Sequence, residues 1–134
     1  MSEERGRIVG IGGIFFKSAD PKNLRAWYAE KLGIGDGGEY TSFDWRTADD
    51  AGTKQMTAWS VFARDTKYFA PSDQSFMINY IVDGLDELLA KLESSGVRID
   101  PKRDDTDYGR FAWIFDADGN KVELWEPPKD VKSS

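Results

Sequence analysis

The chain has 134 residues, which is enough for one compact domain with a hydrophobic core and too few for two domains of ordinary size. It contains no Cys and no His, which excludes disulfides, thiolate chemistry and catalysis by Ser-His-Asp or Cys-His groups. A zinc or iron site would therefore have to be built from carboxylates, amides and water. The net charge of -6, without a long basic cluster, argues against a nucleic-acid partner.

The beginning of the chain, MSEERGR, is charged and lacks the apolar run of a signal peptide. No segment approaches the roughly 20 apolar residues that a membrane-spanning helix needs. We therefore expect a cytoplasmic protein that has no membrane partner.

The first half of the chain begins with a strand followed by an amphipathic helix. Residues 8–17 (IVGIGGIFFK) are β-branched and aromatic enough for a buried strand. Asp20-Pro21 supplies an N-cap and a first helical residue, and Gly33 ends the helix that follows. Between residues 34 and 62, aromatic-rich runs separated by Gly and Asp clusters predict three antiparallel strands of undetermined register.

The second half repeats this order after a polar linker at residues 64–74. Residues 76–82 (FMINYIV) predict a strand, Asp83 is the expected N-cap of a helix of the same length as the first, and Gly96 ends it. Three further strands are expected at residues 97–99, 108–115 and 121–126. The predicted organisation is one domain, with modules at residues 6–63 and 75–127 and a C-terminal tail at 128–134.

Each half therefore has a βαβββ pattern, and the predicted fold class is α+β. Two such modules that pair their curved, mostly antiparallel sheets would enclose a cavity between them. Neither half is large enough to be stable alone, so we expect the two to fold together.

The order of elements resembles the vicinal oxygen chelate superfamily, which includes glyoxalase I, the bleomycin resistance proteins and the extradiol dioxygenases. The resemblance covers nearly the whole chain and rests on the segments ADPKNLRAWYAEKLGI, LDELLAKLESSGV and FAWIFDADGNKVELWEP. It implies the glyoxalase/bleomycin resistance fold. In metal-dependent members, the first strand of each module supplies a His or Gln ligand and the last strand a Glu. Aligning the helix ends and the DADGN turn puts these roles near Gly13, Ser60, Met77 and Glu123, of which only Glu123 can bind a metal, so we expect no metal and no cofactor.

Glu123 is the principal candidate for the functional site. Strand alternation puts this carboxylate in the middle of a sheet face beside Trp125, and the resemblance places its position in the cavity. Two interpretations stay open. Glu123 either pairs with a Lys or Arg on an adjacent strand, or it is a partly desolvated acid that accepts a proton or a hydrogen bond from a ligand.

Aromatic and amide side chains supply the other candidates. Phe111 and Trp113 share one face of the preceding strand, and Asn79 follows Met77 on the same face as a candidate amide for orienting a ligand. Ordinary core packing is the competing interpretation for each of them. The predicted site comprises Glu123, as the candidate catalytic residue and a ligand-binding residue, together with the ligand-binding residues Trp113, Phe111, Trp125, Asn79, Met77 and Trp59.

The leading hypothesis is a metal-independent, glyoxalase-like protein that binds a small, partly aromatic molecule in the cavity between its modules, for sequestration or resistance. The alternative is a lyase, isomerase or dioxygenase-type enzyme with Glu123 as general base or residual metal ligand. The sequence does not decide between a binding protein and an enzyme. Exposed sheet edges also predict a homodimer.

Overall fold

The computed structural model describes residues 5–48 and 51–128. The predicted turn residues Asp49 and Asp50, and positions 129–134 of the predicted tail, lie outside these ranges. The chain order of the elements is β1 (Arg7–Ser18), α1 (Pro21–Leu32), β2 (Thr41–Arg46), β3 (Lys54–Ala63), β4 (Phe76–Asp83), α2 (Leu85–Ser94), β5 (Ile99–Thr106), β6 (Gly109–Phe115) and β7 (Lys121–Glu126).

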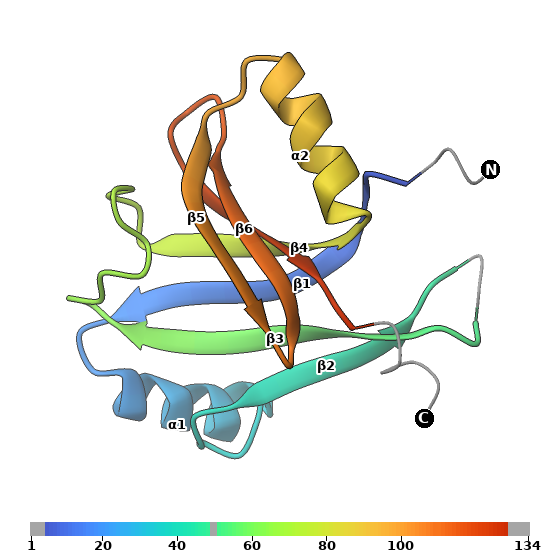
Figure 1. Cartoon of the computed structure of the whole chain (residues 1–134). Helices are drawn as coiled ribbons and strands as arrows, with labels where there is room; N and C mark the ends of the chain where they lie inside the picture. Colours follow the sequence, from blue (N-terminus) through green and yellow to red (C-terminus); the bar gives the residue numbers. More distant parts are fainter. Residues whose placement is uncertain (1–4, 49–50, 129–134) are drawn as a thin grey trace.

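The strands form one 7-stranded sheet in the order β2-β3-β1-β4-β7-β6-β5. The antiparallel pair β1–β4 joins the two halves, and each half contains one parallel pair, β1–β3 or β4–β7. The sheet curves so strongly that β5 and β6 cross in front of β1 and β3, while α1 and α2 lie at opposite ends of the view (Figure 1). The predicted α+β fold class with a curved, mostly antiparallel sheet is confirmed.

The first helix is capped as predicted. The Asp20 side chain accepts a hydrogen bond from the Asn23 N–H at 3.2 Å, and Gly33 ends α1 in a left-handed conformation with φ of 70°. This αL cap is a position where glycine, having no Cβ, is favoured.

The second helix corrects two expectations. Its N-cap is Gly84 and not Asp83, and glycine has no side chain that could bond to the helix. The Leu85 N–H instead donates to the Glu126 carboxylate at 3.1 Å, so a residue of β7 satisfies one of the open donors of α2. The helices also differ in length, with 12 residues in α1 and 10 in α2.

The first half contains two strands after its helix and not the predicted three. Residues 34–40 form no strand, and Gly35 and Gly37 adopt positive φ values of 70° and 91° within this segment. Such conformations interrupt the extended backbone that strand pairing requires. The second half has the predicted three strands, although β5 spans Ile99–Thr106 and not residues 97–99.

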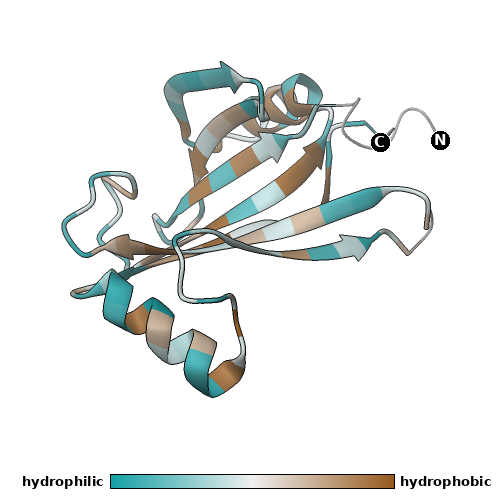
Figure 2. Ribbon diagram, turned by 90° about the horizontal axis from the view of Figure 1, so that it is seen from below, coloured by the Kyte–Doolittle hydropathy of each residue, from teal (hydrophilic) through white to brown (hydrophobic). Residues whose placement is uncertain are grey.

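Two groups of buried side chains pack on the two faces of the sheet. One lies under α2 and consists of Val82, Leu85, Ala112 and Leu124. The other contains Phe15 of β1 and Trp113 of β6, strands that are not neighbours in the sheet, so it occupies the inner face of the curve; its remaining members are Met77 and Phe69. The strands carry alternating hydrophobic and hydrophilic bands, as expected when neighbouring residues face opposite sides (Figure 2). No helix among the described residues is long and apolar enough to cross a membrane.

Candidate functional site

Glu123 lies on the inner face of the sheet, and its side chain is almost completely buried at 3 % exposure. Its directly paired neighbours are Asn79 on β4 and Trp113 on β6. Directly paired residues of adjacent strands point to the same face, so the strand register itself brings a carboxylate, an amide and an indole together.

Three neutral groups donate hydrogen bonds to the Glu123 carboxylate. The Trp113 indole N–H donates to Oε1 at 3.0 Å, the Asn79 amide donates to Oε2 at 2.6 Å, and the Tyr68 hydroxyl donates to Oε1. An indole N–H and an amide NH2 can only donate, so both carboxylate oxygens act as acceptors. None of the ion pairs found among residues 5–48 and 51–128 includes Glu123, which rules out the interpretation in which a Lys or Arg pairs with it.

Lys121 lies two residues before Glu123 on β7, but its ammonium group has other partners. Its Nζ donates to the Tyr68 backbone carbonyl at 3.0 Å and lies 5.7 Å from the centroids of both the Tyr68 and the Trp113 rings. Burial lowers the pKa of Lys121 below its ordinary value. Lys121 therefore covers the faces of the aromatic rings and does not neutralise the Glu123 carboxylate by direct contact.

Tyr68 is a residue of this site that the sequence did not identify. It lies in the segment between β3 and β4, where strand alternation gives no information about side-chain direction. Burial, followed by the neighbouring Glu123 carboxylate, raises the pKa of the Tyr68 hydroxyl above its ordinary value, so it stays a donor and does not act as a base. The adjacent pair Tyr68-Phe69 within a polar linker is the signal that could have found it.

Three aromatic rings continue the inner face away from Glu123. Phe111 stacks on Trp113 with a centroid distance of 6.4 Å and on Trp125 with a distance of 6.1 Å, at interplanar angles of 18° and 4°. The Trp125 indole N–H donates to the Tyr108 carbonyl at 2.7 Å, which fixes the outer ring of the stack. The predicted residues Trp113, Phe111 and Trp125 therefore form one continuous aromatic stack, in which Trp113 is buried.

The remaining two predicted residues lie on different faces. Met77 is fully buried in the inner group with Phe15 and Trp113. Trp59 lies on the other face, where it packs edge-to-face against Phe16 at 5.4 Å and Tyr28 at 5.0 Å below α1. The prediction that Trp59 belongs with Glu123 is therefore corrected. Ser60, the next residue of β3, pairs with the inward-facing Phe15, so Ser60 faces inward and Trp59 faces outward.

The residues at the expected ligand positions do not fit a transition metal. The strand register pairs Phe15 with Ser60 and Asn79 with Glu123, so the first-strand positions are two residues beyond Gly13 and Met77. Helix ends do not report how strands pair, which explains the difference. A phenyl ring, a hydroxyl, an amide and one carboxylate are not a set that holds zinc or iron. In the described part of the chain, no three acidic side chains gather where they could hold a metal ion.

Gly12 explains how the Asn79 amide fits beside Glu123. A Cβ at Gly12 would lie 2.4 Å from Asn79 Oδ1, 2.8 Å from Ile81 and 2.9 Å from Trp125. Asn79 Oδ1 is buried and has no hydrogen-bond partner, whereas the amide nitrogen is bonded to Glu123. The absence of a Cβ at Gly12 therefore leaves the space that the Asn79 amide occupies beside Glu123.

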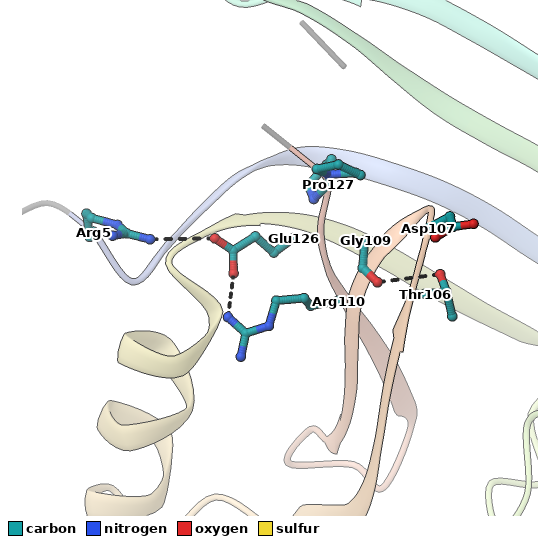
Figure 3. Close-up of a pocket in the computed structure, with 8 residues that line it drawn as sticks. Arg5, Thr106, Asp107, Gly109, Arg110, Glu126 and Pro127 are labelled. Atoms are coloured by element: carbon teal, nitrogen blue, oxygen red, sulfur yellow. Dashed lines mark hydrogen bonds and ion pairs between the residues drawn. The ribbon is translucent and has the colours of Figure 1, made fainter. Parts of the chain in front are cut away.

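A separate cleft of about 530 Å3 lies at the end of β7 (Figure 3), lined by Arg5, Thr106, Asp107, Gly109, Arg110, Glu126, Pro127 and Pro128. Its central carboxylate, Glu126, pairs with Arg110 at 3.4 Å and with Arg5 at 3.5 Å, in addition to its bond with α2. Arg110 also contacts both oxygens of Asp86 at 2.8 and 2.9 Å. Glu126 and the two arginines of this cleft are paired within the protein, so the Glu123 cluster is the better candidate site.

The comparisons with known proteins agree with this architecture. The family model described as "Glyoxalase/Bleomycin resistance protein/Dioxygenase superfamily" matches residues 11–124, and the chain belongs to this superfamily. The resemblance proposed from the sequence is therefore confirmed. A search of curated protein sequences found no match.

Solved structures share the fold at low sequence identity. Methylmalonyl-CoA epimerase from Mycobacterium tuberculosis is 19 % identical, with a TM-score of 0.61 over 95 % of this chain and 93 % of the other. A variant of the Streptomyces coelicolor epimerase in complex with 2-nitronate-propionyl-CoA is 15 % identical, with a TM-score of 0.63 over 90 % of this chain and 99 % of the other. A Legionella pneumophila protein described as NAD-dependent benzaldehyde dehydrogenase is 13 % identical, with a TM-score of 0.55 over 87 % and 98 %. At these identities the likeness concerns the fold alone.

Proposed function

We propose that the chain is a metal-independent member of the superfamily that binds a small, partly aromatic molecule on the inner face of its sheet. Glu123 would accept a hydrogen bond from the ligand, and the stack of Trp113, Phe111 and Trp125 would contact its ring. Sequestration of the molecule, as in resistance, is the biological role that such binding fits.

One observation carries this proposal, namely a buried carboxylate that is held only by neutral donors. Burying a carboxylate costs several kcal/mol in effective desolvation, so a well-packed apolar cluster that replaced the carboxylate together with its donors would usually give equal or better stability. Glu123 has no ion-pair partner among the described residues, and its neighbours Asn79 and Trp113 are arranged to hold it in one orientation. A group that costs stability and is positioned this closely is best explained by a role in binding.

A ligand screen on chelator-treated protein tests the proposal. Planar compounds that carry an O–H or N–H group should raise the melting temperature, because a ligand at 100 times its Kd stabilises the folded state by about 2.7 kcal/mol. The shift should be lost in Glu123→Gln and retained in Ser60→Ala, which changes the corresponding position of the first half. Stabilisation by added metal, with no organic compound effective, would overturn the proposal.

The alternative function is that of a lyase, isomerase or dioxygenase-type enzyme, and the fold of the methylmalonyl-CoA epimerases favours it. A general base must come within hydrogen-bond reach of the proton that it removes. The Tyr68 hydroxyl lies at Oε1, so a substrate, like a bound ligand, would reach this oxygen only after Tyr68 has moved away. Glyoxalase and extradiol dioxygenase assays should be negative with chelator and with added nickel, zinc or iron(II), and activity with any of these metals would favour the enzyme.

We also propose a cytoplasmic homodimer, as the sequence predicts. Strands β2 and β5 are the terminal strands of the open sheet, and open edges commonly pair or pack with a second copy. Sedimentation equilibrium should give twice the monomer mass, and a single monomeric species at all accessible concentrations would refute this part of the proposal.

A further inference from the structure

Tyr68 makes the contacts that a bound aromatic ligand would make. Its hydroxyl donates to Glu123, its ring stacks on Phe62 at 5.7 Å with an interplanar angle of 2°, and it meets Trp113 edge-to-face at 6.3 Å. Lys121 Nζ covers the ring at 5.7 Å from its centroid. The phenol ring of Tyr68, a residue of the linker, is thus surrounded on several sides by other residues of the protein.

The attachment of Tyr68 differs from that of its neighbour Phe69. Phe69 is fully buried in the inner group of side chains, whereas Tyr68 is only partly buried. The Tyr68 backbone is held separately, because its carbonyl accepts from Lys121 at 3.0 Å and its N–H donates to Thr66 at 3.2 Å. Rotation of the Tyr68 side chain toward solvent would therefore leave both the anchor Phe69 and the local backbone in place.

We propose that the Glu123 site takes a neutral phenol, and that Tyr68 fills this site as an internal competitor until such a ligand arrives. This inference rests on the proposed function, and it names the chemical class of the ligand. The hydroxyl of the ligand would donate to Glu123 Oε1. Its ring would take the place of the Tyr68 ring between Phe62, Trp113 and Lys121, at the Trp113 end of the aromatic stack.

The charges around the site select this class. An anionic ring, such as a benzoate or a phenolate, would be repelled by the buried Glu123 carboxylate. A ring carrying an ammonium group would meet two cations, Lys121, whose Nζ lies 5.7 Å from the centroid of the Tyr68 ring that the ligand would replace, and Lys102, whose Nζ lies 5.4 Å from the centroid of the Trp113 ring. A neutral ring with one O–H donor satisfies Glu123 and lets the Lys121 ammonium make a cation–π contact. The same surroundings raise the pKa of the Tyr68 hydroxyl, which shows that they favour the protonated form of a phenol.

Competition from within makes a quantitative prediction about affinity. The apparent affinity of a ligand equals its intrinsic affinity multiplied by the fraction of molecules whose site is open. Tyr68→Phe keeps the ring but removes the bond to Glu123, so it should increase the open fraction without creating a void. A hydrogen bond to a charged acceptor contributes enough to change this fraction by roughly tenfold.

The test uses p-cresol, which reproduces the tyrosine side chain, and toluene, which lacks only the hydroxyl. Isothermal titration calorimetry is carried out on the wild type, Tyr68→Phe and Tyr68→Ala, with Tyr108→Phe as the matched control because Tyr108 is 77 % exposed. We expect p-cresol to bind Tyr68→Ala and Tyr68→Phe roughly tenfold tighter than the wild type and Tyr108→Phe, and toluene to bind every variant roughly tenfold weaker than p-cresol.

Each other outcome contradicts a defined part of the inference. Equal binding of toluene and p-cresol by Tyr68→Ala would mean that the compounds merely fill a void, and the inference would fail. If Tyr68→Phe bound p-cresol no tighter than the wild type, Tyr68 would not compete. If no variant bound p-cresol while a compound of another class still bound in a Glu123-dependent way, the phenol class would be wrong and the proposed function would stand. If nothing bound to any variant, both would fail.

Discussion

The parallel strand pairs of the two halves place different residues at corresponding points of the inner face. In the second half, β4 and β7 bring together Asn79 and Glu123, which are 2 % and 3 % exposed. In the first half, β1 and β3 bring together Phe15 and Ser60, and Phe15 belongs to the apolar inner group. At this point of the inner face the second half therefore has a buried amide and carboxylate, whereas the first half has an aromatic ring and a hydroxyl.

This difference between the halves suits the binding of an aromatic molecule and does not suit the binding of a metal ion. A divalent transition metal needs ligands that converge from both halves, and the first half offers only a ring and a hydroxyl. An aromatic ligand needs one fixed polar contact and apolar walls, which is what Glu123 and the surrounding rings provide. Together the two halves therefore offer the contacts that an aromatic ring needs, but not the ligands that a metal ion needs.

The largest effect should come from removing the Glu123 carboxylate. Glu123→Leu leaves the Trp113, Asn79 and Tyr68 donors without their acceptor, so the free energy of unfolding should fall by about 3–5 kcal/mol in urea titrations. Ser60→Ala, at the corresponding point of the first half, should change it by less than about 0.5 kcal/mol. Equal effects of the two substitutions would remove the distinction between the halves.

A smaller loss is expected from crowding the Asn79 amide. In Gly12→Ala the new Cβ would lie 2.4 Å from Asn79 Oδ1, and relief of this overlap should cost about 1–3 kcal/mol and move the amide off Glu123. Gly38→Ala is the control, since Gly38 is exposed and a Cβ there approaches only the flexible Asp36 side chain. An unaltered Trp113 indole resonance in Gly12→Ala would show that Asn79 does not hold the carboxylate in place.

Tyr68→Phe should cost about 1.5 kcal/mol at neutral pH, because it removes one hydrogen bond to a charged acceptor. The folded-state pKa of Tyr68 is raised above the ordinary value of 10.0, so the wild type keeps this advantage below that pH and loses it as the pH rises further. Thermal unfolding of both proteins between neutral and strongly alkaline pH checks the prediction. A difference that grew above pH 10.0 would have the wrong sign.

The smallest effect should be that of divalent metal. Nickel, zinc or iron(II) added to chelator-treated protein should leave the melting temperature unchanged, since the residues at the strand pairs do not form a ligand set. A saturable increase that disappeared in Glu123→Gln would indicate a metal site after all.

Strand alternation and helix caps made much of the fold predictable. The boundaries of β7 follow from the run after the DADGN turn, and the side-chain period of two correctly put Glu123 and Trp125 on one face. Asp20 and Gly33 fixed α1 because their side-chain and backbone preferences act locally. Features that depend only on neighbouring residues, such as strand alternation and the caps of α1, could therefore be predicted from the sequence.

Features that depend on packing between distant segments were not accessible. Alternation separates Trp59 from Ser60 but does not say which of them faces inward, and the pairing partner Phe15 decides it. Tyr68 reaches Glu123 from a linker that has no periodic pattern. The cap of α2 comes from Glu126, which is far away in the chain, so the expected Asp83 cap was wrong.

The most direct test of the Glu123 site is the indole N–H spectrum of metal-free, 15N-tryptophan-labelled protein during titration with a compound selected in the ligand screen. Trp113 donates to Glu123, whereas Trp59 packs on the opposite face below α1, so the two resonances report on the two sides of the sheet. We predict that the Trp113 resonance moves in a saturable way while that of Trp59 stays in place, and that Glu123→Gln abolishes the change. A ligand that moved Trp59 and left Trp113 unaffected would contradict the site.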